Sequence, residues 1–180
     1  MKVYPEITPE LAEWIAAQPL FFNATAPLSK EGHINLSPRG LDSLRVIGPN
    51  EVVILDLTGS GNETAAQMTE NGRITIMFCS FAGPPRILRL FGSGEVILPK
   101  NEKWQTLRAH FPADVPGVRQ LFHVQVSRVQ TSCGYGVPLM NFVAQRDDLL
   151  NWATKKGEEG ILEYQEKNNT ISIDGLPAPR

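Results

Sequence analysis

The stretch that decides the fold is residues 52–78, VVILDLTGSGNETAAQMTENGRITIMF. An apolar run is followed by a Gly-Ser-Gly turn, an Ala-rich segment and a second apolar run. This pattern predicts a strand, a tight turn, a short helix that begins after Asn62, and another strand. The Asn62 side chain is expected to cap the first turn of that helix, whose positive end would face the glycine turn. The local sequence leaves two interpretations open, a plain strand-to-helix turn and an anion site.

Known phosphate and nucleophile motifs do not fit this turn. Thr64 stands where the dinucleotide fingerprint, which begins here with Gly59 and Gly61, would have its third glycine. No GxxxxGK[ST] segment and no GxSxG segment occurs in the chain. The sequence therefore assigns no side chain as a catalytic nucleophile, acid or base.

Composition bounds the class of protein. The chain has 180 residues, 42% of them hydrophobic, and a formal net charge of -2. That length predicts a single domain over residues 1–180, and the absence of any Lys/Arg-rich block argues against a nucleic-acid binder. No apolar run approaches the roughly 20 residues that a membrane helix needs, and the opening residues lack a signal-peptide core, so we expect a cytoplasmic protein. Two cysteines and three scattered histidines predict no metal site.

The rest of the chain adds strands with bends and peripheral helices. Gly92-Ser93-Gly94 interrupts one apolar run, which predicts a bulge. Pro38 cannot donate to a sheet, so the strand before it is expected to end at Leu36. Expected strands are 20–26, 33–36, 73–81, 86–98 and 121–131, and expected helices are 8–18, 101–111, 146–156 and 158–167. This order predicts a mainly β antiparallel barrel, with 145–180 as a helical C-terminal extension.

The order and spacing of these pieces resemble the pyridoxamine 5'-phosphate oxidase-like family. The likeness covers about residues 19–142, and the segments that carry it are SPRG (37–40), VVILDLTGSGNETAAQM (52–68), RITIMF (73–78), RLFGSGEVI (89–97) and VQTSCGYGVP (129–138). Members adopt the FMN-binding split β-barrel, an antiparallel Greek-key barrel of the α+β class with peripheral helices. The resemblance implies this fold, FMN as cofactor, and a homodimer with its cofactor sites at the subunit interface.

The resemblance also implies a phosphate site. In the family, a strand that ends in Lys-Gly supplies a cation to the FMN phosphate, and Arg39 with Gly40 stands in that place here. A Ser followed by basic residues opens the next helix in the family. Asn62, Glu63 and Thr64 occupy those positions, so hydrogen-bonding capacity is kept and the positive charge is missing. Arg39 is therefore the expected main cation, with Ser60, Asn62, Thr64 and helix-start amides around the phosphate and Arg45 as a further candidate.

The flavin ring in such proteins lies against strand backbone. The resemblance places one wall of the ring site at residues 35–37, including Asn35 and Ser37, and at residues 53–56, including Val53 and Leu55. The second wall would come from the partner subunit. Tyr135 and Arg89 are candidates to reach across, and an interface tyrosine and a surface arginine are their alternative interpretations.

The functional expectation is an FMN-dependent oxidoreductase that acts on a small molecule. The oxidase proper has a C-terminal segment with Arg and Trp that holds the vitamin substrate, and no counterpart follows Phe142. Oxidase activity on pyridoxamine phosphate is therefore not assigned. Three alternatives stay open: a non-catalytic flavin-binding or flavin-sensing protein, a protein that holds haem or a deazaflavin, and a structural domain whose pocket is empty.

Overall fold

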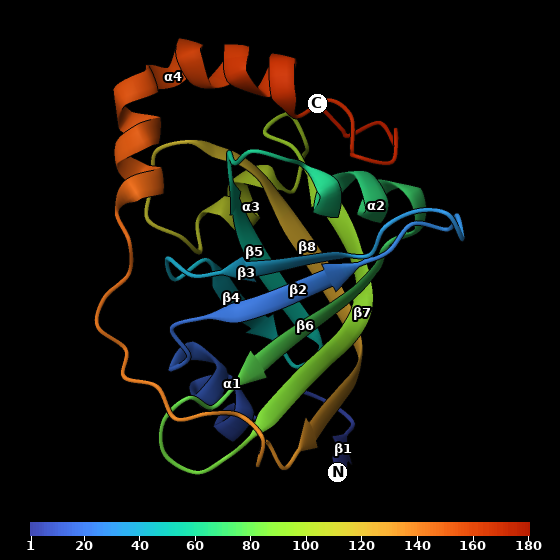
Figure 1. Cartoon of the computed structure of the whole chain (residues 1–180), viewed down its shortest axis with the longest axis vertical. Helices are drawn as coiled ribbons and strands as arrows, with labels where there is room; N and C mark the ends of the chain where they lie inside the picture. The colour runs from blue at the N-terminus through green and yellow to red at the C-terminus, as the bar shows by residue number, and fades with distance from the viewer.

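A computed structural model describes all of residues 1–180 and contains eight β-strands and four α-helices (Figure 1). The strands are β1 (Lys2–Tyr4), β2 (Phe21–Thr25), β3 (Asn35–Arg39), β4 (Leu44–Gly48), β5 (Glu51–Leu57), β6 (Arg73–Cys79), β7 (Ile87–Ile97) and β8 (Val118–Ser132). The helices are α1 (Pro9–Ala16), α2 (Glu63–Asn71), α3 (Trp104–Arg108) and α4 (Asp148–Asn168). None of these helices combines the length and the apolar character needed to cross a bilayer.

All eight strands belong to one antiparallel sheet. The order is β3-β2-β6-β7-β8-β5-β4, and β1 adds to β8. β3 and β5 are first and sixth in that order, yet Arg39 Nη1 on β3 lies 2.6 Å from Asp56 Oδ1 on β5. The sheet therefore curls round until its two ends face one another, as Figure 1 shows where β2 and β3 cross in front of β4 and β5. The expected mainly β antiparallel architecture is confirmed.

Side chains of β5 alternate between two cores. Val52 and Ile54 pack in the main cluster inside the barrel, and Val53 and Leu55 pack in a second cluster under α3. All four are buried, which explains why the sequence of β5 is a continuous apolar run and not an alternating one. Asp56 follows Ile54 in the alternation, so its carboxylate points to the barrel interior.

The segment β5-α2-β6 confirms the predicted strand, helix and strand in residues 52–78. The predicted cap is wrong. Asn62 occupies the N-cap position of α2, but its side chain makes no capping hydrogen bond. Its Nδ2 donates to the Asn169 carbonyl oxygen at 3.2 Å, and its Oδ1 accepts from Gln120 Nε2 at 2.7 Å. These buried partners take the side chain away from the helix amides.

Three further elements, β3, α3 and β4, differ from the expectations. β3 continues through Pro38 to Arg39, because β3 is an edge strand that pairs only with β2 and the missing N–H faces no neighbour. α3 is shorter than the predicted helix 101–111, and β4 was not predicted. The predicted bulge at Gly92 is confirmed by a register shift, and a Cβ there would clash with the Gln125 carbonyl.

Candidate functional site

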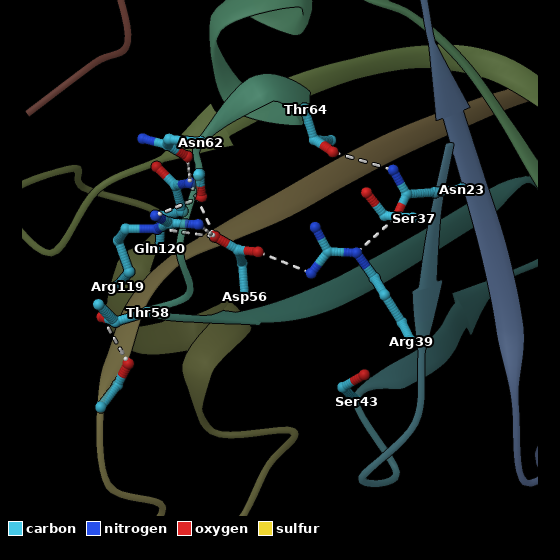
Figure 2. A network of polar contacts seen from close by, with 12 residues as sticks. Asn23, Ser37, Arg39, Ser43, Asp56, Thr58, Asn62, Thr64, Arg119 and Gln120 are labelled. Atoms are coloured by element: carbon cyan, nitrogen blue, oxygen red, sulfur yellow. Dashed lines mark hydrogen bonds and ion pairs between the residues drawn. The ribbon is translucent and has the colours of Figure 1, made fainter. Parts of the chain in front are cut away.

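A buried carboxylate forms the centre of the polar network inside the barrel. Asp56 is 1% exposed. Its Oδ1 accepts from Arg39 Nη1 at 2.6 Å, and its Oδ2 accepts from Arg119 Nη2 at 2.9 Å and Nε at 3.1 Å. Gln120 Nε2 donates to the same Oδ2 at 2.8 Å (Figure 2). Three strands, β3, β5 and β8, thus converge on one carboxylate.

The network holds an excess of positive charge. Burial alone raises the pKa of Asp56, but the charges of Arg39 and Arg119, with hydrogen bonds from Arg39 and Gln120, bring the pKa below its usual value. The carboxylate is therefore ionised at neutral pH. Two guanidinium groups against one carboxylate leave a net charge of +1. An anion that reaches this network would meet a partly buried positive charge.

Arg39 presents that positive charge toward solvent. Its Nε donates to Asn23 Oδ1 and its Nη1 to Asp56, while its Nη2 makes no hydrogen bond within the protein. The side chain is 16% exposed, and its guanidinium lies 5.2 Å from the centre of the Phe122 ring. Arg45 differs, because both of its Nη atoms bond to Asp42. Arg39 is thus the guanidinium with an open edge in this network.

Hydroxyl and amide groups surround Arg39 on β2, β3 and α2. Thr64 Oγ1 accepts from Asn23 Nδ2 at 3.0 Å and from Asn35 Nδ2 at 2.9 Å. Ser37 Oγ donates to Asn35 Oδ1 at 3.1 Å. The structure therefore brings four predicted site residues, Asn35, Ser37, Arg39 and Thr64, into one polar cluster. Figure 2 shows Ser37, Arg39 and Thr64 in it. Asn62 joins it indirectly, because Gln120 donates to both Asn62 and Asp56.

The other predicted site residues lie outside this cluster in the single chain. The side chains of Val53 and Leu55 pack under α3, on the opposite face of β5 from Asp56. Ser60 is exposed in the turn before α2. Arg89 Nη1 donates to Ser132 Oγ at 3.2 Å, and Tyr135 is 82% exposed in the loop after β8. Their roles toward a cofactor stay predictions.

Sequence reasoning missed four members of the network: Asn23, Asp56 as an ionic centre, Arg119 and Gln120. One signal was available. Asp56 follows the continuous apolar run 52–55 within β5, and a charged residue in a buried run requires a charged partner. The partners themselves lie on β3 and β8, 17 and 63 residues away in the sequence, so the pattern could not identify them.

The C-terminal segment covers the start of α2. Asn169 Oδ1 accepts from Arg119 Nη1 at 2.7 Å, and Asn169 Nδ2 donates to the Gly59 carbonyl at 3.1 Å. The Ile173 amide donates to both oxygens of Glu63, at 3.1 and 3.2 Å. Glu63, at a position where the resemblance implies a basic residue, therefore holds the chain's own C-terminal segment.

A second contact of this segment should depend on pH. His33 Nδ1 lies 2.7 Å from Asp174 Oδ1, and the His33 amide donates to Asp174 Oδ2 at 2.7 Å. The hydrogen bond and charge of Asp174 raise the pKa of His33, and the hydrogen bonds from His33 lower the pKa of Asp174. The contribution of His33 to the stability of this contact is complete below about pH 6.5 and is lost as pH rises through the folded-state pKa of His33. The contribution of Asp174 is complete above about pH 4 and is lost as pH falls through its folded-state pKa.

We therefore expect hydrogen-exchange protection of the Ile173 amide, corrected for intrinsic rate, to be greatest between about pH 4 and 6.5. The variant His33→Gln should lose the decline on the alkaline side of that window. The matched control His110→Gln changes an exposed histidine and should keep the wild-type profile. Protection that is flat across this range in the wild-type protein would contradict the contact.

No group of three His, Cys, Asp or Glu side chains gathers in a way that could hold a metal ion.

Comparison with known proteins identifies the family. The family model described as pyridoxamine 5'-phosphate oxidase matches residues 7–133. A curated relative, the pyridoxamine 5'-phosphate oxidase family protein ustO of Aspergillus flavus, is 36% identical over 192 residues that cover 97% of this chain and 76% of the relative.

Two solved structures share the fold. HupZ of Group A Streptococcus has a TM-score of 0.58 at 20% identity, covering 71% of this chain and 94% of its own. A candidate pyridoxamine 5'-phosphate oxidase of Lactobacillus delbrueckii has a TM-score of 0.55 at 14% identity, covering 72% and 99%. The split-barrel fold expected from the sequence is thus confirmed, and the chain belongs to the pyridoxamine 5'-phosphate oxidase family.

Proposed function

We propose that the protein binds FMN at the Arg39 cluster and uses it to oxidise or reduce a small molecule. The observation that carries this proposal is the unpaired Nη2 edge of Arg39 in a network with a net charge of +1. The N–H groups of a free guanidinium nitrogen can donate charge-assisted hydrogen bonds to phosphate oxygens. Membership of the family supports a flavin as the phosphate-bearing ligand.

Each residue of the cluster has a defined task in this proposal. Arg39 binds the phosphate through its open edge while Asp56 and Asn23 fix the orientation of its guanidinium. Ser37 and Thr64 add hydroxyl groups, and Ser60 and Asn62 lie at the turn before α2. Because β3 pairs only with β2, its second backbone edge is open to a flat ring.

The rest of the ring site is proposed to form in a homodimer. Val53 and Leu55 would support the strand behind the ring, and Arg89 and Tyr135 would approach from the partner subunit. The exposure of Tyr135 supports such a role, since an exposed aromatic ring beside glycines can pack on a second protomer. When bound, FMN supplies hydride or electron transfer, and the protein positions it and limits access of water.

The haem alternative is less well supported by the residues present. An axial ligand would normally come from a histidine. His33 is paired with Asp174 and His123 with Glu51, and neither belongs to the Arg39 cluster. His110 is exposed beyond α3. The donor set around Arg39 consists of hydroxyl, amide and guanidinium groups, which suit a phosphate.

The proposal is tested with the purified protein of residues 1–180. We expect FMN to bind with one flavin per chain, the bound flavin to be reduced by NADH or NADPH, and an added electron acceptor to reoxidise it. Light scattering should report two chains per particle. Flavin that binds but is not reduced would support a carrier or sensor, and protein that fails to bind added FMN would refute the proposal.

A further inference from the structure

A large cavity lies under α4, away from the Arg39 cluster. Its volume is about 1060 Å³, and its walls come from α4, from residues 113–119 and from residues 98–99 after β7. Ligand sites for small organic molecules commonly measure about 300–1,000 Å³. The cavity is therefore large enough for an organic molecule of ordinary cofactor or substrate size.

A kink in α4 shapes the roof of this cavity. Gly157 has φ 68° and ψ 175° within α4, and the two halves of the helix meet there at a steep angle (Figure 1). Ala153 and Thr154 from the first half and Ile161 and Gln165 from the second half all line the cavity. No heavy atom lies within 4 Å of a Cβ built at Gly157, so the glycine serves the backbone turn and not a close contact.

Two polar side chains of the inner wall already have hydrogen-bond partners within the protein. Arg119 is bonded to Asp56 and Asn169. Gln165 Nε2 donates to Thr58 Oγ1 at 2.8 Å. Buried polar groups that are satisfied in this way do not require a charged ligand. The charged residues elsewhere on the lining are of both signs and create no field of one sign: Arg108, Arg180, Asp114, Glu158 and Glu166.

The remaining wall offers apolar contact. Leu98 and Val118 lie on the barrel side, and Ile161 and Leu162 lie on the helix side. Leu162 is 59% exposed although it borders the cavity, so part of the apolar wall is in contact with water. Removing that surface from water would favour the binding of an apolar molecule.

We propose that the cavity under α4 binds an uncharged, mainly apolar organic molecule at a site separate from the flavin site. Asn62, at the margin of the proposed flavin site, borders the cavity together with Arg119, whereas Ser37, Arg39 and Thr64 do not. Asp56 lies between Arg39 and Arg119 in the network, so the two sites are on opposite sides of this carboxylate (Figure 2). The inference does not depend on flavin binding.

The test uses N-phenyl-1-naphthylamine, an uncharged dye whose emission rises in apolar surroundings, with the full chain. Thr154→Trp introduces a large side chain at an exposed position on the cavity wall and should weaken dye binding at least tenfold. The matched control Lys155→Trp changes the next residue, which is exposed and outside the lining, and should bind the dye as the wild-type protein does.

A second variant and competition with FMN complete the test. If Thr154→Trp does not fold, as judged by circular dichroism, Leu162→Arg places a charge on the same wall and should give the same loss. Saturating FMN should leave the dye in place. The proposal is overturned if the wild-type protein does not bind the dye, or if the dye binds all variants equally. It is also overturned if FMN displaces the dye, or if an anionic sulfonate analogue binds more tightly than the uncharged dye.

Discussion

Asp56→Asn should lower the free energy of unfolding by about 3–5 kcal/mol, the cost typical of breaking a buried ion pair. The substitution keeps the shape of the side chain and removes the charge that both Arg39 and Arg119 contact at 2.6 and 2.9 Å. Two guanidinium groups, 16% and 8% exposed, would then face each other without a counter-charge. Urea unfolding followed by tryptophan fluorescence measures the loss.

A surface ion pair supplies the control. Asp42 pairs with Arg45 at 2.7 Å, and the Asp42 side chain is 77% exposed. Asp42→Asn removes the same charge from a solvated pair, and asparagine tolerates the positive φ of 51° at this position. We expect a loss of at most about 1 kcal/mol. Equal losses for the two variants would contradict a special role for the buried network.

The pH dependence of stability gives an independent readout of the same prediction. The pKa of Asp56 is lowered in the folded protein, so its contribution is present above the unfolded value of about 3.9 and is lost as pH falls through the folded value. The difference in stability between wild type and Asp56→Asn should therefore be largest near neutral pH and shrink on acidification. A difference that does not vary with pH would mean that the variant acts through packing alone.

The local segments of the fold could be predicted from the sequence. Residues 52–78 contain both strands and the helix between them, and Thr8 with Pro9 marks the start of α1, where Thr8 Oγ1 accepts from the Leu11 amide. Predictions failed where a distant partner decides the outcome. The Asn62 side chain does not cap α2, because it bonds to Gln120 and to the Asn169 carbonyl instead. Pro38 stayed within a strand because the sheet order places β3 at an edge.

The candidate site shows the same division. The proximity of Arg39 and Thr64 was expected, because the family resemblance assigns both to one phosphate site, and Asn23 links them in the structure. Their role toward a phosphate stays a prediction. The charge on the network could not be predicted, because Asp56 acquires Arg119 only when β8 pairs with β5. Glu63 is a further example. Its bond to the Ile173 amide spans 110 residues and became visible only in the folded chain.

The second large effect concerns FMN affinity. Arg39→Lys should raise the dissociation constant for FMN about 100-fold, which corresponds to about 2.7 kcal/mol. A lysine ammonium can replace one charge opposite Asp56, but it cannot donate to Asn23, Asp56 and a phosphate through the separate nitrogens of a planar fork. Loss of one or two charge-assisted hydrogen bonds accounts for an effect of this size. Fluorescence quenching of FMN measures the constant.

Riboflavin separates loss of a phosphate contact from general damage to the site. It carries the same ring and lacks the phosphate, so it makes no contact that depends on the Arg39 fork. Its dissociation constant should therefore change less than about twofold in Arg39→Lys, which corresponds to under about 0.5 kcal/mol. Arg45→Lys alters a guanidinium already held by Asp42 and should affect neither ligand. If Arg39→Lys weakens FMN and riboflavin equally, Arg39 supports the ring wall and the phosphate lies elsewhere. If FMN affinity is unchanged, the open edge of Arg39 is not the phosphate site.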